Sequence, residues 1–125
     1  MGYETSITEY PDYVRVQVRG ERSPGHSVAN ADRVGEMIVE YCQDKGIDRI
    51  MLVLELEGRL GPLDAVGIVT HAPNYGFHHG FRLAFVDLNA ESYRDSLFTE
   101  TVAVNRSYSM RVFDKEQDAR EWLLC

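Results

Sequence analysis

The sequence predicts an α/β fold with one mixed five-stranded sheet and four helices, in the order β-β-α-β-α-β-α-β-α. Two short strand-like stretches flank Pro11-Asp12 near the start of the chain, which indicates an antiparallel hairpin. Helix-like and strand-like patterns then alternate to the end, as is typical of parallel βαβ units. The chain has 125 residues, 44% of them hydrophobic. That size and composition predict a single domain, residues 1–125, that folds around its own core.

The hairpin is predicted from strands Tyr3–Glu9 and Tyr13–Glu21. The second strand alternates strictly between apolar and polar residues, so one of its faces is apolar and the other is polar. The apolar positions are Val14, Val16 and Val18, and the polar positions are Arg15, Gln17 and Arg19. The polar face is interpreted as a solvated strand surface, with a binding surface as the alternative.

An amphipathic helix is predicted over residues 28–45, because apolar residues recur there at steps of three and four. Ser27 is its expected N-cap and Gly46 its expected C-terminal stop. Cys42 falls on the buried stripe of this helix. Cys42 and Cys125 are the two cysteines of the sequence, which is too few for a disulfide framework.

The stretch Arg49–Leu56 is continuously apolar at its centre, which indicates a strand buried on both faces in the middle of the sheet. A helix is expected over Pro62–Ala72, with Pro62 at its first position. Pro73 ends it, and Asn74–Gly80 is expected to be a loop.

The last third of the chain adds two strands and two helices. The strands are expected at Phe81–Leu88 and Ser109–Phe113. Asn89 is the expected cap of a helix that begins near Ala90, and Asp114 is the expected cap of the final helix. In that final helix Ala119, Trp122 and Leu123 form one apolar stripe, so Trp122 is predicted to be mostly buried.

The arrangement of the helices follows from the handedness of the connections. Right-handed crossovers that step through the sheet in one direction place the helices largely on one face. The other face of the central strand would then be apolar and uncovered. A homodimer that shields this face is therefore expected.

Charge and hydropathy exclude several classes of partner. The chain has 13 basic and 20 acidic residues, a net charge of −7, which argues against nucleic-acid binding and against adsorption to anionic membranes. No apolar run approaches the roughly 18 residues of a membrane span. Because the N-terminus lacks a signal-peptide pattern, the cytoplasm is the expected location.

The candidate binding site lies where the predicted parallel strands end, at the carboxyl edge of the sheet. A helix N-terminus also opens onto this edge and offers unpaired N–H groups. The candidate residues are Glu57, Gly58, Arg59, Gly61, Asp87 and Asn89. Asp87 and Asn89 have an alternative role as helix caps. Because Glu57 and Asp87 repel anions, a neutral polar ligand or a basic partner surface is favoured over a phosphate.

The histidines form a second, weaker candidate site. His78 and His79 are adjacent and precede a strand, so they lie at the opposite edge of the sheet from Arg59. Zinc requires three or four convergent ligands, and no Cys or carboxylate near them in sequence completes such a set. No metal and no cofactor are therefore expected. Tyr75 and Phe77 are expected to pack over this lower edge, with a small-molecule pocket as the alternative.

The segment Met110–Leu123 resembles the end of SpoIIAA-like proteins of the STAS domain superfamily, in which a strand and a Phe are followed by an acidic cap, an Ala and a Trp-Leu pair. The order of elements resembles that superfamily over the whole chain. The resemblance implies a SpoIIAA-like fold and a non-enzymatic regulatory or protein-interaction domain like the anti-sigma factor antagonists.

The resemblance also implies where a phosphorylation switch would lie. Regulatory members of the superfamily carry a phosphorylated Ser or Thr at the N-terminus of the helix after the central strand. The corresponding stretch here, Glu57–Asp64, contains no Ser or Thr. No catalytic residues are predicted, because the sequence specifies no nucleophile with a partner base. The alternative function is a carrier of a small apolar molecule or lipid in a cavity between helices and sheet.

Overall fold

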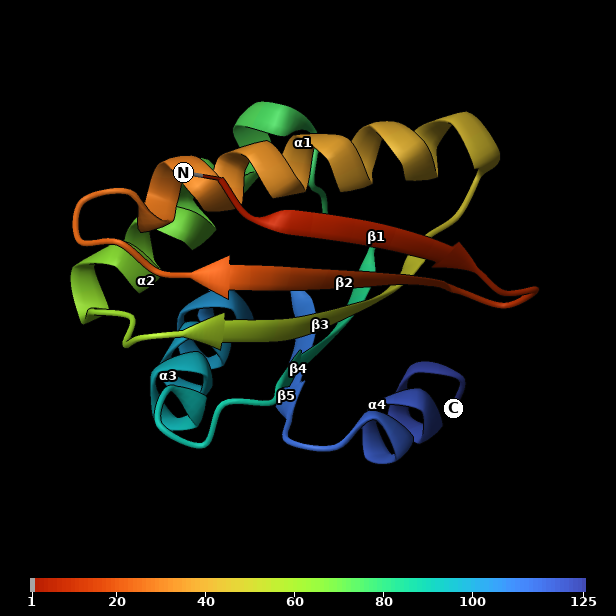
Figure 1. Ribbon diagram of the computed structural model, residues 1–125. Coiled ribbons are helices and arrows are strands. Elements are labelled where there is room, and N and C mark those ends of the chain that lie inside the picture. Colours follow the sequence, from red (N-terminus) through yellow and green to blue (C-terminus); the bar gives the residue numbers. More distant parts are fainter. Residues whose placement is uncertain (1) are drawn as a thin grey trace.

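The computed structural model describes residues 2–125 and contains one sheet of five strands. The strands are β1 (Glu4–Glu9), β2 (Val14–Glu21), β3 (Arg49–Glu57), β4 (Arg82–Asp87) and β5 (Ser109–Phe113). Their order in the sheet is β1-β2-β3-β4-β5 (Figure 1). β1 pairs antiparallel with β2, and the other pairs are parallel. The predicted mixed sheet, with its first strand antiparallel and at the edge and β3 at its centre, is confirmed.

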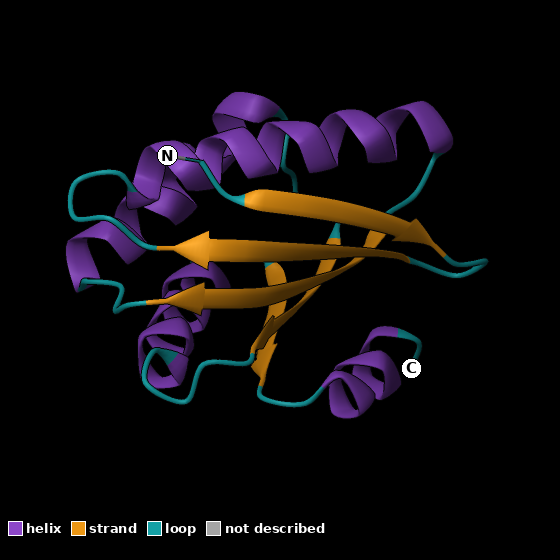
Figure 2. Cartoon of the chain, in the orientation of Figure 1, coloured by secondary structure: helices purple, strands orange, loops and turns teal. Residues whose placement is uncertain are grey.

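Five helical segments accompany the sheet (Figure 2). They are α1 (Ser27–Lys45), α2 (Pro62–His71), the short 3-10 helix η1 (Ala72–Tyr75), α3 (Tyr93–Asn105) and α4 (Glu116–Leu123). The four α-helices and their order agree with the prediction. The segment predicted as a loop begins at Asn74, but Asn74 and Tyr75 belong to η1. Pro73 ends the α-helical hydrogen bonding, and one further turn of the tighter 3-10 type still forms.

Three helices cover one face of the sheet. The inward side chains of β2 and β3 pack on α1, among them Val16, Ile50 and Leu54. Ala103 of α3 packs with Val69 of α2 and with Val112 of β5. Each of these helices connects parallel strands that step through the sheet in one direction, so right-handed crossovers place them on the same side.

The fourth helix lies on the opposite face, contrary to the prediction of a largely one-sided helix layer. Ala119 and Leu123 of α4 are fully buried against Met51, Val53 and neighbouring residues of β4. Within residues 2–125 no strand follows α4, so no crossover fixes its side (Figure 1). Its apolar stripe covers the apolar centre of the second face. The reason for expecting a homodimer, an uncovered apolar face, is therefore wrong.

Ion pairs occupy the polar face of β2. Arg15 holds Glu116 of α4 through two hydrogen bonds of 2.7 and 3.0 Å. Gln17 donates a hydrogen bond to Glu55 of β3, and Arg19 lies 3.6 Å from the same carboxylate. These contacts support the interpretation of this face as a polar strand surface.

Several helix boundaries differ from the prediction. Ser27 is the first residue of α1 rather than its cap, and His26 takes the cap position without a side-chain bond. Lys115, not Asp114, precedes α4. Gly46 ends α1 in the left-handed conformation, with φ of 67°, as predicted, because glycine adopts this conformation without a steric penalty.

Trp122 is partly buried and packs against the cluster that contains Ala119 and Leu123. The guanidinium carbon of Arg82 lies 3.8 Å from the centre of its indole ring, and the ring of Phe113 lies 5.9 Å away. Arg82 also donates a hydrogen bond of 2.6 Å to the Trp122 carbonyl. Trp122 therefore lies at the border of the α4 interface, while Leu123 lies at its centre.

Candidate functional site

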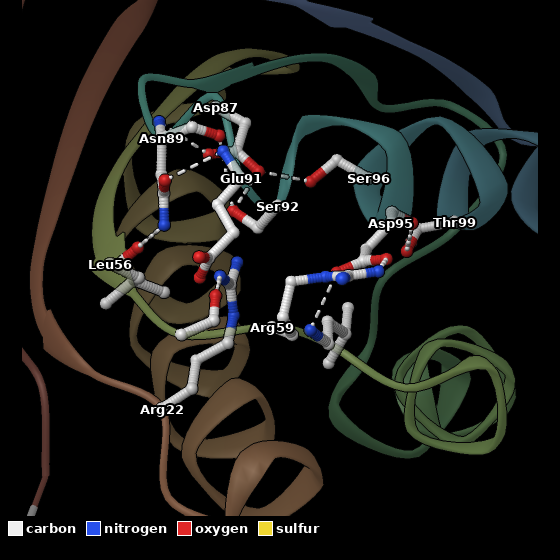
Figure 3. A network of polar contacts seen from close by, with 12 residues as sticks. Arg22, Leu56, Arg59, Asp87, Asn89, Glu91, Ser92, Asp95, Ser96 and Thr99 are labelled. Carbon is white, nitrogen blue, oxygen red and sulfur yellow. Dashed lines mark hydrogen bonds and ion pairs between the residues drawn. The ribbon is translucent and has the colours of Figure 1, made fainter.

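The structure gathers the predicted site residues at the carboxyl ends of β3 and β4 (Figure 3). The side-chain amide of Asn89 donates a hydrogen bond of 2.9 Å to the Leu56 carbonyl, which joins the loop after β4 to the end of β3. The backbone amide of Asn89 donates a hydrogen bond of 3.0 Å to the carboxylate of Asp87. The predicted grouping of these residues at one edge agrees with the topology, because adjacent parallel strands end side by side.

Asp87 is buried, with 1% of its surface exposed, and both of its carboxylate oxygens accept hydrogen bonds. One oxygen accepts hydrogen bonds from the hydroxyls of Ser92 and Ser96, at 2.9 and 2.7 Å. The other accepts the Asn89 amide. These bonds fix the start of α3 beneath the loop. Asp87 therefore has a structural role in this arrangement, and Ser92, not Asn89, precedes the first residue of α3.

Asn89 organises the turn before α3 instead of capping that helix. Its side-chain oxygen accepts the amide of Glu91 at 3.0 Å, which is an Asx-type turn. The helix then begins three residues later than the sequence suggested, at Tyr93. The β-branched residues near its end remain helical because Ala103 and Thr99 are buried in its packing against neighbouring elements.

Arg59 is held by an acidic partner that sequence reasoning missed. Its guanidinium makes two hydrogen bonds, of 2.8 and 2.9 Å, to the carboxylate of Asp95 in α3. The Leu60 amide donates a third bond to Asp95, at 2.9 Å. The hydrogen bonds from Arg59 lower the pKa of Asp95, and the hydrogen bond from the Leu60 amide lowers it further. Partial burial of the carboxylate has the opposite effect, which is smaller than that of the Arg59 bonds. The loop after β3 is thus tied to the first turn of α3.

The glycines of this loop allow its path. Gly58 has a φ of 93°, in the region that favours glycine. Its carbonyl accepts a hydrogen bond of 2.9 Å from the guanidinium of Arg22. Gly61 precedes α2 in an extended conformation with Pro62 at the first helical position. Glu57 is exposed at the end of β3.

Chemically, this edge offers an ordered loop and a helix N-terminus. Its two internal carboxylates already accept three hydrogen bonds each. Asp95 and Arg22 had no sequence signal, because they are distant in sequence from Arg59 and Gly58. Ser92 and Ser96 had a weak sequence signal, because residues four positions apart lie on the same face of a helix.

The histidines lie at the opposite end of the strands. His79 stacks on Tyr108 with ring centres 4.7 Å apart, and its Nε2 lies 3.0 Å from the Arg106 carbonyl. His78 stacks on Phe81 at 4.4 Å. Within residues 2–125, His, Cys, Asp and Glu form no group of three that could hold a metal ion. The stacking gives both rings a packing role over this edge of the sheet.

An apolar cavity of about 140 Å³ lies between the sheet and helices α1, α2 and α3. Its walls include Leu52, Leu83 and Phe85 on the inner face of the central strands. These three side chains remain partly exposed, although helices cover their face. Tyr75 and Phe77 also line the cavity, and burial raises the pKa of the Tyr75 hydroxyl to about 12.

Solved structures that are similar to this chain share a SpoIIAA-like fold. An anti-sigma factor antagonist from Mycobacterium paratuberculosis matches with a TM-score of 0.59 and 12% identity, over 98% of this chain and 95% of that one. An uncharacterized protein of the DUF3478 family from Shewanella loihica, with a SpoIIAA-like fold, matches with a TM-score of 0.54 and 14% identity, over 98% and 94%.

At these identities the likeness establishes the fold, and the chain has a SpoIIAA-like fold as the sequence predicted. No protein-family model matches the sequence, and no curated protein matches it significantly. Among residues 2–125, no helix is both long enough and apolar enough to cross a bilayer.

Proposed function

We propose that the chain is a non-enzymatic regulatory domain of the cytoplasm that binds a protein partner at the carboxyl edge of its sheet. The SpoIIAA-like fold that it shares with an anti-sigma factor antagonist supports this proposal. The hydrogen bonds that Asp87 and Asp95 accept from within the protein also support it, because a general base directs its carboxylate at the substrate.

The observation that carries the proposal is the exposure of Leu63 in the first turn of α2. Leu63 is 87% exposed, and Leu88, in the segment after β4, is 45% exposed. Exposed apolar side chains beside ordered polar groups are a feature of protein-binding surfaces. Leu63 comes shortly after the predicted site residues Gly58 and Arg59 at the end of β3, and Leu88 comes directly after the end of β4.

Binding at this edge is proposed to need no phosphorylation. The stretch Glu57–Asp64, which carries the switch in the regulatory proteins that the sequence resembles, has no hydroxyl side chain. Asp64 in the first turn of α2 gives this end of the helix a permanent negative charge, which also suits the helix dipole.

The test compares partners retained by the wild-type chain and by Leu63→Asp. Val104→Asp is the matched control, because Val104 is a 51% exposed apolar residue on another helix. We expect affinity purification from the native cell to recover one partner with the wild type and with Val104→Asp, and to lose it with Leu63→Asp. A partner retained equally by all three chains would place the interaction elsewhere.

A second candidate function, carriage of a small apolar molecule, is favoured by the cavity. Well-packed interiors hold few empty spaces larger than a water molecule. A cavity of about 140 Å³ with apolar walls therefore stands out. It is similar in size to the roughly 150 Å³ cavity that binds benzene in an engineered protein.

Mass spectrometry separates the two candidates. The purified protein is measured under native conditions before and after extraction with organic solvent and refolding. We expect a co-purified small molecule, present before extraction and absent afterwards, if the domain is a carrier. An unliganded mass in both samples, together with failure to bind any apolar probe, would leave only the protein-interaction function.

A further inference from the structure

The cavity between the sheet and helices α1–α3 has a buried cation in its wall. Arg22 follows β2, lines the cavity, and is only 9% exposed. Ser27 and Leu60 line the same end. The lining also includes Ile50, near the start of β3, and Tyr75, at the end of η1. The cavity therefore runs along the strands from a charged end to an apolar one.

Arg22 has few partners for a buried charge. A guanidinium carries five N–H donors, and within residues 2–125 Arg22 uses its side chain in one hydrogen bond, to the Gly58 carbonyl. It forms no ion pair with a described residue, unlike Arg15, Arg19 and Arg59. Buried charges are ordinarily paired, because removing them from water is costly.

A carboxylate that interacts with the charge of Arg22 already accepts hydrogen bonds from other groups. The positive charge of Arg22 contributes to the lowered pKa of Asp95. The two oxygens of Asp95, however, accept hydrogen bonds from the Arg59 guanidinium and the Leu60 amide. Figure 3 shows the side chain of Arg22 extending toward this network from below. Arg22, whose side chain lines the cavity, thus has N–H groups that bond no acceptor within residues 2–125.

We propose that the cavity binds a short alkyl carboxylate, with its acid group on Arg22 and its chain along the inner face of β3 and β4. This inference rests on the carrier function proposed above and specifies its ligand class. Guanidinium groups recognise carboxylates through paired hydrogen bonds. A single available cation beside Glu57, Asp87 and Asp95 suits one negative charge better than the two of a phosphate monoester.

The dimensions limit the chain length. Ile50 and Leu56, which both line the cavity, are six positions apart on one strand, or about 20 Å at roughly 3.3 Å per residue. The volume of about 140 Å³ is narrow for that length. A similar volume holds the six carbons of benzene, so only a short alkyl chain is proposed, and about eight carbons is the longest that we test.

The experiment titrates the unlabelled probes octanoate and octan-1-ol into the isotopically labelled protein and follows backbone amide signals by NMR. We expect both probes to shift signals of Leu52, Leu83 and Phe85, with octanoate bound about tenfold or more tightly. Arg22→Met is expected to remove this preference and to leave octan-1-ol binding unchanged. Arg19→Met, on the opposite face of the sheet, is the matched control.

Each outcome decides a separate point. Failure of both probes to bind the wild type overturns the carrier function and this inference together. Equal binding of both probes by the wild type, or an unchanged preference in Arg22→Met, keeps the carrier function and overturns recognition of the acid by Arg22. Because the comparison of probes on the wild type needs no variant, a folding defect in Arg22→Met would not prevent the test.

Discussion

Single side chains at the carboxyl edge contribute mainly to stability. Asp95 joins the loop after β3 to α3 through bonds to Arg59 and Leu60. Asp87 does the same for the loop after β4 through Ser92 and Ser96. Several of the predicted site residues thus form an ordered support, and the contacts proposed above are Leu63 for a protein partner and Arg22 for a ligand.

The ion pair of Asp95 predicts a pH dependence of stability. Its pKa is lowered in the folded state, so the stabilisation is complete above the unfolded pKa, about 3.9. It is lost as the pH falls through the folded value. We expect Asp95→Asn to lower the free energy of unfolding by about 1 kcal/mol at pH 7. Urea denaturation at several pH values measures this, and the difference should shrink below about pH 4.

Asp44→Asn is the control for this titration. Asp44 is exposed on α1 and makes no ion pair with another residue of the described chain. We expect it to change stability little at either pH. A difference between wild type and Asp95→Asn that persists unchanged at pH 3 would contradict the assigned role of the ion pair.

The two cysteines are expected to react at very different rates. Cys42 is fully buried in α1, and burial raises the pKa of its thiol to about 11. Cys125 is exposed. Because the thiolate is the reactive form, Ellman's reagent at pH 8 should modify one thiol quickly in the native protein and the second only in denaturant. Rapid modification of Cys125→Ser in native buffer would show that α1 opens readily.

Among the elements, α4 shows how a short helix completes a core. It has eight residues, too few to be stable alone. Its stability comes from Ala119 and Leu123, which are buried on the second face of β3 and β4. The ion pair between Glu116 and Arg15, which lowers the pKa of Glu116, adds a contact at its first turn.

Two neighbouring leucines at the end of this helix, Leu123 inside it and Leu124 directly after it, provide a matched test. Leu123 is fully buried, whereas Leu124 is 37% exposed. We expect Leu123→Ala to lower the free energy of unfolding by about 2–5 kcal/mol, because it leaves a cavity against β3 and β4. Leu124→Ala should lower the free energy of unfolding much less. Chemical denaturation compares the two, and equal effects would argue that α4 does not pack on the sheet as described.

At the scale of the whole molecule, covering both faces of the sheet bears on the oligomeric state. α4 buries the apolar centre of the second face, and ion pairs cover its polar part. We therefore expect light scattering at high concentration to give a mass near the 14.3 kDa of one chain. A mass twice as large would show that another surface joins two copies, such as the exposed Phe98 and Val104 of α3.

The sequence by itself determined the order of the elements and the sheet. Alternation in β2, the apolar run of β3 and the glycine after α1 are local signals, and local signals together with right-handed crossovers fix the strand order. They also brought Glu57, Arg59, Asp87 and Asn89 to one edge.

Only the tertiary structure decided the partners of those residues, because each partner comes from a distant part of the chain. Asp95 lies 36 residues from Arg59, and Gly58 lies 36 residues from Arg22. The side of the sheet taken by α4 and the cavity beneath α1 are also properties of packing. No single segment encodes them, since both depend on how side chains of several elements fill the same space.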